Sequence, residues 1–198
     1  MKVLIVLAHP DSASFNHAIA QTAADALASN GHEAILHDLY AEGFDPLLKR
    51  AELARNPELD ESVSRHIADL RDADALIFVH PNWWGMPPAA MVGWIDRVVR
   101  QGVAYKFVAG DKGEGVPVGL LKAKKAMVFN TANTLDAREK AVFGDPLESI
   151  WKKCVFGLCG ISDVTRRTFS VVIVSDLAQR RAWLNEVAGT VSKAFPKA

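Results

Sequence analysis

The chain is poor in cysteine and has no excess of either charge. Only two cysteines, Cys154 and Cys159, occur among 198 residues, and both lie in an apolar run. We therefore expect two small buried hydrophobic residues rather than a disulfide or a metal-binding pair. Lysine plus arginine number 23, as do aspartate plus glutamate, and this balance argues against nucleic-acid binding, which usually needs a basic surface. A surface near zero net charge also resists self-association little, so a homodimer is easily accommodated.

Long hydrophobic segments are missing as well. No stretch approaches the roughly 20 apolar residues that span a bilayer, and the apolar start at residues 3–8 is too short for the core of a signal peptide. We therefore expect a cytoplasmic protein without a membrane span. The length of 198 residues and the apolar share of 49% predict one domain, residues 1–198, with a substantial core.

Apolar, β-rich segments alternate with helical patterns along the chain. We expect strands at 2–8, 33–39, 75–79 and 125–129 and within 164–174, and helices at 15–29, 47–72 (broken at Pro57), 89–100, 146–158 and 176–194. The glycine-rich region 103–118 predicts an irregular excursion. The alternation predicts an α/β fold, a flavodoxin-like doubly wound sandwich around a five-stranded parallel sheet of order 2-1-3-4-5.

In that strand order the loops after the first and third strands are neighbours, at the point where open α/β sheets bind ligands. Loop 9–16 lacks the dinucleotide-binding glycine fingerprint and the P-loop lysine. It offers instead the polar side chains of Ser12, Ser14 and Asn16 at a helix start, where free N–H groups favour phosphate, and His9 would add positive charge. A simple N-cap role for Ser14 and a strand-end role for His9 explain the same residues equally well.

Loop 81–88 contains Trp83 and Trp84 between prolines and glycine. Two adjacent tryptophans cannot both point into one core. A wide planar ligand such as an isoalloxazine would give one of them a stacking or edge contact. The alternative is that both pack on the sheet end as large hydrophobic residues, and the position at the switch point favours the ligand.

Several motifs together resemble the NAD(P)H:quinone reductase (DT-diaphorase) flavoprotein family. In chain order they are Ala8-His9-Pro10, Ser14-Phe15-Asn16, Pro81-Asn82-Trp83-Trp84, Pro88-Ala89, Gly93-Trp94-Ile95-Asp96-Arg97-Val98, Gly102-Val103-Ala104-Tyr105, Phe143-Gly144-Asp145 and Phe156-Gly157-Leu158-Cys159-Gly160. They run from the first residue to position 160.

The resemblance implies a flavodoxin-like fold, bound FAD or FMN, and a homodimer with two composite active sites. It also implies ping-pong hydride transfer from NAD(P)H, through the flavin, to a quinone-like acceptor. By the same resemblance, the flavin phosphates would be held by Ser14, Phe15 and Asn16 with His9 nearby, and the isoalloxazine would be lined by Pro81, Asn82, Trp83, Trp84 and Gly85. The residues after the fourth strand match the position of the family's flavin loop but not its sequence: Asn130, Thr131, Ala132, Asn133 and Thr134. Donors from Thr131, Asn133 or Thr134 would stabilise the charge of the reduced ring. By the resemblance, Tyr105 and Phe107 would close the pocket from the partner subunit.

The chain also departs from the family pattern. A Tyr and a His that manage charge on the reduced flavin fall at Ala137 and Phe143, so this pair is missing. Asp96 and Arg97 read as a structural pair on a helix surface or at a subunit contact, and Asp145 reads as a helix N-cap before Pro146.

Four histidines (His17, His32, His37 and His66) are scattered, and no Cys/His/carboxylate spacing predicts a metal site.

Three other functions stay open at this point. A flavodoxin-type electron shuttle would bind FMN and dock on proteins, although such carriers usually have an acidic face. A regulatory subunit would accompany a glutathione-gated potassium efflux system, as some similar proteins do. A nucleotide-binding protein without flavin is the third. The residues decide neither FAD against FMN nor NADH against NADPH.

Overall fold

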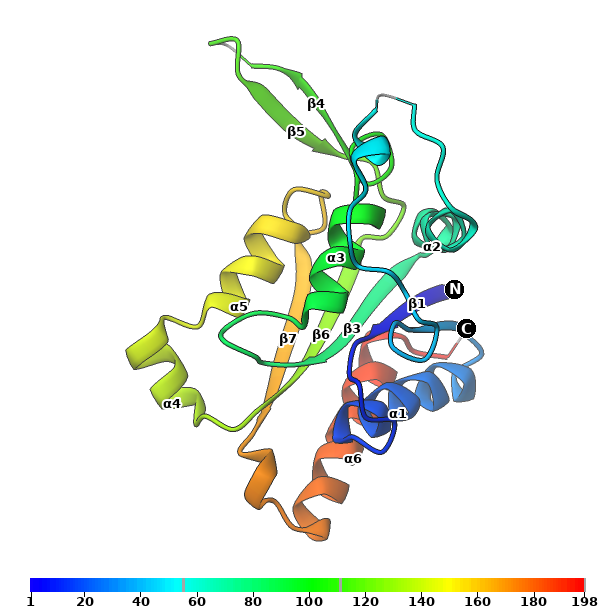
Figure 1. Ribbon diagram of the computed structural model, residues 1–198. Coiled ribbons are helices and arrows are strands. Elements are labelled where there is room, and N and C mark those ends of the chain that lie inside the picture. The colour runs from blue at the N-terminus through cyan, green and yellow to red at the C-terminus, as the bar shows by residue number, and fades with distance from the viewer. Residues whose placement is uncertain (55, 111, 198) are drawn as a thin grey trace.

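A parallel sheet of five strands forms the centre of the protein (Figure 1). The computed structural model describes residues 1–54, 56–110 and 112–197. The sheet has the order β2-β1-β3-β6-β7, with β1 at Lys2–Leu7, β2 at Glu33–Asp38, β3 at Ala75–Pro81, β6 at Lys125–Ala132 and β7 at Asp163–Ser170. Counted within the sheet alone, this order is 2-1-3-4-5, so the predicted flavodoxin-like fold class is confirmed.

Helices cover both faces of the sheet (Figure 1). One layer contains α1 (Phe15–Ser29) and α6 (Leu177–Ala194), which pack against each other. The other contains α2 (Glu61–Asp72), α3 (Ala89–Val98) and α5 (Pro146–Ser149), which continues as η3 (Ile150–Val155).

Successive strand residues point to opposite faces, so β1 serves two cores. Leu4 and Val6 belong to the core under α2 and α3, and Val3 and Ile5 to the core under α1 and α6. This double burial explains why the strands are continuously apolar.

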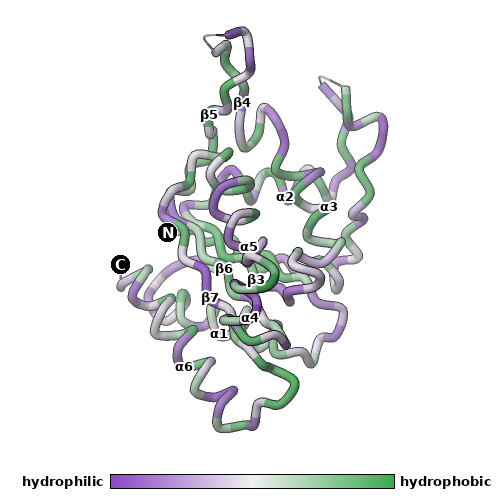
Figure 2. Tube along the Cα trace, turned by 90° about the vertical axis from the view of Figure 1, so that its left-hand side faces the viewer, coloured by the Kyte–Doolittle hydropathy of each residue, from purple (hydrophilic) through white to green (hydrophobic). Residues whose placement is uncertain are grey.

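The region expected to be irregular contains an antiparallel hairpin, β4 (Tyr105–Ala109) and β5 (Gly115–Gly119). It projects from one end of the sheet, and Figure 2 shows it extending away from the hydrophobic centre. Glycine and proline suggested a loop, but a two-stranded ribbon has only edge strands, where proline is tolerated because its missing N–H faces outwards. Pro117 lies there, opposite Phe107.

The segment before α2 also differs from the expectation. Its only helical part among the described residues is η1, a short 3-10 turn at Arg50–Leu53, and α2 begins after Asp60, whose side chain accepts a hydrogen bond from the Val63 N–H. Two further short pieces, α4 (Asp136–Arg138) and η2 (Glu139–Phe143), were not expected. None of their residues is buried, so they carry no apolar periodicity to detect. Past Ser170 the last predicted strand gives way to a 3-10 turn, η4 (Val172–Val174).

Among the described residues, none of the helices combines the length and the apolar character needed to cross a bilayer.

Candidate functional site

The predicted ligand-binding loops meet at the carboxyl ends of β1, β3 and β6. These strands pair in parallel, with Leu7 beside Val79 and Pro81 beside Thr131, so the loops that follow them emerge from one edge of the sheet. The Asn16 amide donates a hydrogen bond of 3.0 Å to the Thr131 hydroxyl and thereby joins the start of α1 to the end of β6.

The loops that follow β1 and β3 also lie close together. The rings of His9 and Trp83 are 6.0 Å apart. The Asn82 N–H donates to the Thr131 carbonyl oxygen at 2.7 Å, so the second loop is tied to β6 as well. The structure thus brings together residues that lie more than a hundred positions apart in the chain.

The start of α1 has the features of an anion site. The Ser14 hydroxyl accepts a hydrogen bond from the His17 N–H, and the first turn of this 15-residue helix holds no acidic residue, so its positive dipole end is not neutralised by its own side chains. Ser14 therefore is an N-cap, as one interpretation expected, beside a helix end suited to phosphate. Phe15 packs its side chain against Phe169 and Trp183, so its only group available to a phosphate is its backbone N–H.

The tryptophan loop forms a tight turn with unusual backbone angles. Trp83 and Met86 exchange two backbone hydrogen bonds, of 3.1 and 3.0 Å, and the two residues between them, Trp84 and Gly85, have φ of 59° and 73°. Such angles define a type I′ turn, and for a non-glycine residue they cost about 1 kcal/mol. Trp84 is 98% exposed and Trp83 41% exposed, so the expectation that both cannot enter the core is confirmed.

A buried polar row lies under this edge of the sheet. His80 and Asn130 are paired across β3 and β6, and both are 0% exposed. The His80 Nε2 accepts hydrogen bonds from the Asn130 amide at 2.8 Å and from the Trp151 indole at 3.0 Å, and its Nδ1 donates to the Pro81 carbonyl oxygen at 2.8 Å. Burial lowers the pKa of His80 to about 4. Both ends of the Asn130 amide are hydrogen-bonded within this row, so its side chain stabilises the strand ends and does not face a ligand.

The row ends in an arginine with two carboxylates. Arg166 donates to the Asn130 amide oxygen at 3.2 Å and to Glu148 at 2.8 Å, and its guanidinium also pairs with Asp145. Asp145 is the N-cap residue before Pro146, as predicted, but its side chain makes no capping hydrogen bond. Its φ of 49° turns the residue into the left-handed region, and the carboxylate pairs with Arg166 on β7 instead.

A polar cavity of about 370 Å³ opens beside the tryptophan turn. Its wall includes Asn82, Ala132 and Thr134 from the predicted site, together with Glu139 and Arg166. No local sequence pattern indicates Glu139 as a site residue. Two consecutive arginines, 166 and 167, lie inside the last expected strand, and charged residues in a buried strand indicate an ion pair.

Comparisons with known proteins agree with this geometry. Residues 1–188 match the family described as having the flavodoxin-like fold. An uncharacterized NAD(P)H oxidoreductase of Haemophilus influenzae is 32% identical over 192 residues, which cover 95% of this chain and 93% of that protein. The chain belongs to the flavodoxin-like NAD(P)H:quinone reductase family.

Two further members show the range of this reductase family. NAD(P)H dehydrogenase (quinone) 1 of Cavia porcellus is 31% identical over 172 residues, covering 76% of this chain and 60% of the relative, so the match spans less than two thirds of that longer protein. The solved NAD(P)H:quinone oxidoreductase from Methanothermobacter marburgensis has a TM-score of 0.80 at 25% identity and covers 98% of this chain and 96% of that chain.

Tyr105 and Phe107 do not reach the site of their own chain. They lie in β4, which follows the far end of α3 (Figure 1), and a ten-residue helix separates its two ends by about 15 Å. Their rings are 5.5 Å apart, and Phe107 is 47% exposed.

Three more predicted positions lie on the segment after β6. Asn133 is exposed, and its side-chain oxygen accepts a hydrogen bond from the Ile173 N–H at 3.0 Å. Ala137 and Phe143, the positions of the missing family pair, are both exposed. This segment therefore supplies Glu139 and Thr134, not a Tyr–His pair, to the cavity wall.

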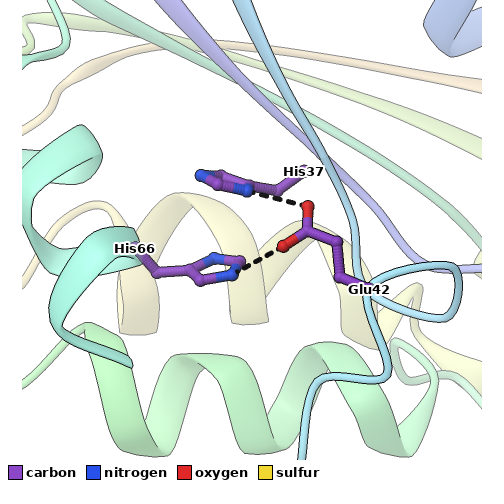
Figure 3. Close-up of side chains that lie close together, drawn as sticks. All are labelled: His37, Glu42 and His66. Carbon is purple, nitrogen blue, oxygen red and sulfur yellow. Dashed lines mark hydrogen bonds and ion pairs between the residues drawn. The ribbon is translucent and has the colours of Figure 1, made fainter. Parts of the chain in front are cut away.

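Two of the histidines that are scattered in the sequence meet in space (Figure 3). His37 and His66 stack with ring centroids 3.8 Å apart, and each donates to one oxygen of Glu42, at 2.9 and 3.0 Å. The other His37 nitrogen lies 2.8 Å from Asp69, and the Trp94 indole donates to His66 Nδ1 at 2.9 Å.

This cluster has the composition of a metal site, but the His66 nitrogen that faces Glu42 carries a hydrogen. Because the Trp94 indole is only a donor, His66 Nδ1 must be the acceptor, and the Nε2 that faces Glu42 keeps its hydrogen. A protonated ring nitrogen has no lone pair for a metal ion. Burial, together with the charge of His37, lowers the pKa of His66 to about 4, which keeps it neutral. The cluster anchors the loop after β2 to α2 and α3.

Two further expectations are corrected. Asp96 is exposed, whereas Arg97 is buried and binds Glu52 at 2.5 Å and Asp60 at 2.6 Å. Consecutive helical residues point in different directions, so the expected Asp96–Arg97 pair does not form.

The cysteines differ from each other in burial. Cys159 is buried, and burial raises its pKa to about 11, but Cys154 is exposed. The expectation of two buried cysteines is thus right for one of them.

Proposed function

We propose that this chain is an NAD(P)H dehydrogenase (quinone)-type oxidoreductase that binds FAD or FMN. In this proposal hydride passes from NAD(P)H through the flavin to a quinone-like acceptor, one substrate leaving before the next enters. The observation that carries the proposal is the meeting of a helix N-terminus that has no acidic residue in its first turn with an exposed tryptophan turn, linked by the 6.0 Å approach of His9 to Trp83. The first suits phosphate, and the second suits a flat ring.

The side chains fit a flavin in three further ways. Ser14 caps α1 through the His17 N–H, and the first-turn N–H groups that it does not cap would face an anion. Trp84 is 98% exposed, and that much aromatic surface is stabilised when a planar ligand covers it. Thr134 lines the cavity beside the turn, where its hydroxyl and the neighbouring backbone N–H groups would stabilise the negative charge of a reduced ring.

A bound flavin supplies the hydride chemistry, and the protein supplies orientation and electrostatics. In this chain the tryptophan turn orients the ring and excludes water from one side. His80, whose pKa burial lowers to about 4, would stay neutral and would add no cationic proton donor to the site. Neither Ala137 nor Phe143 has a side chain that can transfer a proton, so the proton required by a reduced quinone would come from solvent.

We also propose a homodimer. The hairpin carries Tyr105 and Phe107 away from the site of their own chain. Phe107 is exposed and Tyr105 is partly buried against the core, and this aromatic pair at the base of a projecting ribbon is suited to cover the ring site of a second copy. The dimer, the cytoplasmic location and the single-domain organisation stay predictions.

The direct test is to purify the protein, release any yellow cofactor by heat and identify it by chromatography. Anaerobic rapid mixing with NADH or NADPH should then bleach the flavin, and benzoquinone, an azo dye or a nitroaromatic compound should restore its colour at different rates. A colourless protein that refuses added flavin would contradict the proposal. A flavin that NAD(P)H does not reduce would favour an electron shuttle, and co-purification with a membrane transporter would favour a regulatory subunit.

The composite site has its own test. Two variants are compared: a Tyr105→Ala/Phe107→Ala chain and a Trp84→Ala chain, each of which should be impaired alone. When the two are mixed, half of the dimers contain one chain of each kind, and each of these dimers has one intact site and one damaged site. Mixing should therefore restore up to a quarter of the wild-type activity. No recovery on mixing would contradict shared sites.

A further inference from the structure

Asn82 is fully engaged in holding the tryptophan turn. Its side-chain oxygen accepts the Gly85 N–H at 3.0 Å, and its amide nitrogen donates to Glu139 Oε1 at 3.1 Å. The two bonds need opposite ends of the amide, so the Glu139 carboxylate selects the orientation in which the oxygen faces Gly85.

The turn needs such support because it is strained. Trp84 adopts a φ of 59°, and a residue in this region persists only where its surroundings enforce the conformation. Gly85 has no room for a side chain, since a Cβ there would lie 3.0 Å from Pro146 Cγ. Asn82 and Pro146 therefore hold the turn from two sides.

Glu139 itself lies on a segment that no core packing holds. The residues of α4 and η2 are all at least partly exposed. The described side-chain hydrogen bonds of this segment are that of Glu139 to Asn82 and that of Asp136 with the Ser170 hydroxyl, at 2.9 Å. One bond ties the segment to the loop after β3, and the other ties it to the end of β7.

We propose that Glu139 is a positioning residue for the flavin-ring site. Its carboxylate fixes the Asn82 amide, the amide fixes Gly85, and the turn then presents Trp83 and Trp84 in one conformation. The inference rests on the proposed function for the identity of the ring, but the chain of contacts belongs to the protein alone. Glu139 touches no reacting atom in this account and acts through Asn82.

The test compares Glu139→Ala and Glu139→Gln with Arg138→Ala, a matched change at the neighbouring exposed position. The first readout is hydrogen exchange of the Gly85 amide in flavin-free protein, measured by NMR. Loss of a charge-assisted hydrogen bond should speed this exchange about tenfold in Glu139→Ala. Glu139→Gln keeps an acceptor oxygen, so its Gly85 exchange rate should lie within about threefold of the wild-type rate. The exchange rate in Arg138→Ala should equal the wild-type rate.

The second readout is the dissociation constant of FMN or FAD from the apoprotein, measured by fluorescence. Glu139→Ala should raise it about tenfold, in step with the exchange rate, while the melting temperature stays near that of Arg138→Ala. Unchanged Gly85 exchange in Glu139→Ala would overturn the inference, as would equal effects of the alanine and glutamine variants. If wild-type protein binds no flavin, the proposed function fails, but the exchange experiment still decides the role of Glu139.

Discussion

His80 makes the stability of this protein sensitive to acid in a way that can be calculated. The ring is fully buried, and burial lowers its pKa from the ordinary 6.5 to about 4. In the unfolded chain the ring takes up a proton as the pH falls below 6.5, whereas in the folded protein it does so only near pH 4. The unfolded state therefore binds more protons in this window, and the free energy of unfolding falls as the pH falls.

The size of the effect follows from the same two values. At about 1.4 kcal/mol per pH unit, the wild type should lose about 3 kcal/mol between pH 7 and pH 4 through this ring alone. His80→Gln removes the titrating group. At pH 7 the variant should be less stable by about 1–3 kcal/mol, because buried partners such as the Trp151 N–H lose their acceptor. This deficit should shrink, and vanish or reverse, as the pH approaches 4.

Urea unfolding followed by far-UV circular dichroism, at steps from pH 7.5 to pH 4, measures both slopes. His66, whose pKa burial also lowers to about 4, is present in both proteins and cancels in the difference. Parallel stability curves for wild type and variant over this range would refute the reasoning. An NMR titration that finds the His80 ring protonated near pH 6.5 would refute it as well.

Two further changes test the packing around the site. Gly93→Ala should destabilise the protein by more than about 2 kcal/mol or prevent folding, because the new Cβ would lie 2.1 Å from the Pro46 carbonyl oxygen. Gly189→Ala places its Cβ with no atom within 4 Å and should stabilise helix α6 by about 0.5–1 kcal/mol. Thermal melts compare the two variants, and equal shifts in melting temperature would contradict the contact of Gly93 with Pro46. Arg97→Met should cost about 3–5 kcal/mol in urea unfolding because it leaves Glu52 buried at 3% exposure without a partner. Arg97→Met/Glu52→Leu should recover much of that loss, and a double variant as unstable as the single one would show that the pair is not the cause.

The strands and the main helices could be predicted because their signals are local. The continuous apolar run of β1 indicates burial on both faces. The helix after it begins at Phe15, directly after its N-cap Ser14. The hairpin could not be found in this way. Its strands are mostly exposed, and Pro117 and the glycines resemble a loop unless the partner strand is known. The segment at 136–143 has the same difficulty, since none of its residues is buried.

The candidate site was predictable to the level of loops and not to the level of contacts. The strand order alone brings His9 towards Trp83, because parallel neighbouring strands end at the same edge. Nothing in the sequence relates Glu139 to Asn82, which lies 57 positions away, or Arg166 to Asp145. Those pairs depend on the path of the chain after β6 and on a backbone turn at Asp145.

By itself, the sequence determined the α/β fold, the strand order and the two loops where a ligand would bind, because hydrophobic periodicity and loop composition act over a few residues. Which side chains those loops leave free depends on contacts made in the folded protein. Tyr105 lies on the hairpin, away from the site of its own chain. In the folded protein, Asn130 and Asn82 make internal hydrogen bonds and Asp145 pairs with Arg166. These are contacts between residues far apart in the chain, and their energies depend on distance and burial in the folded protein.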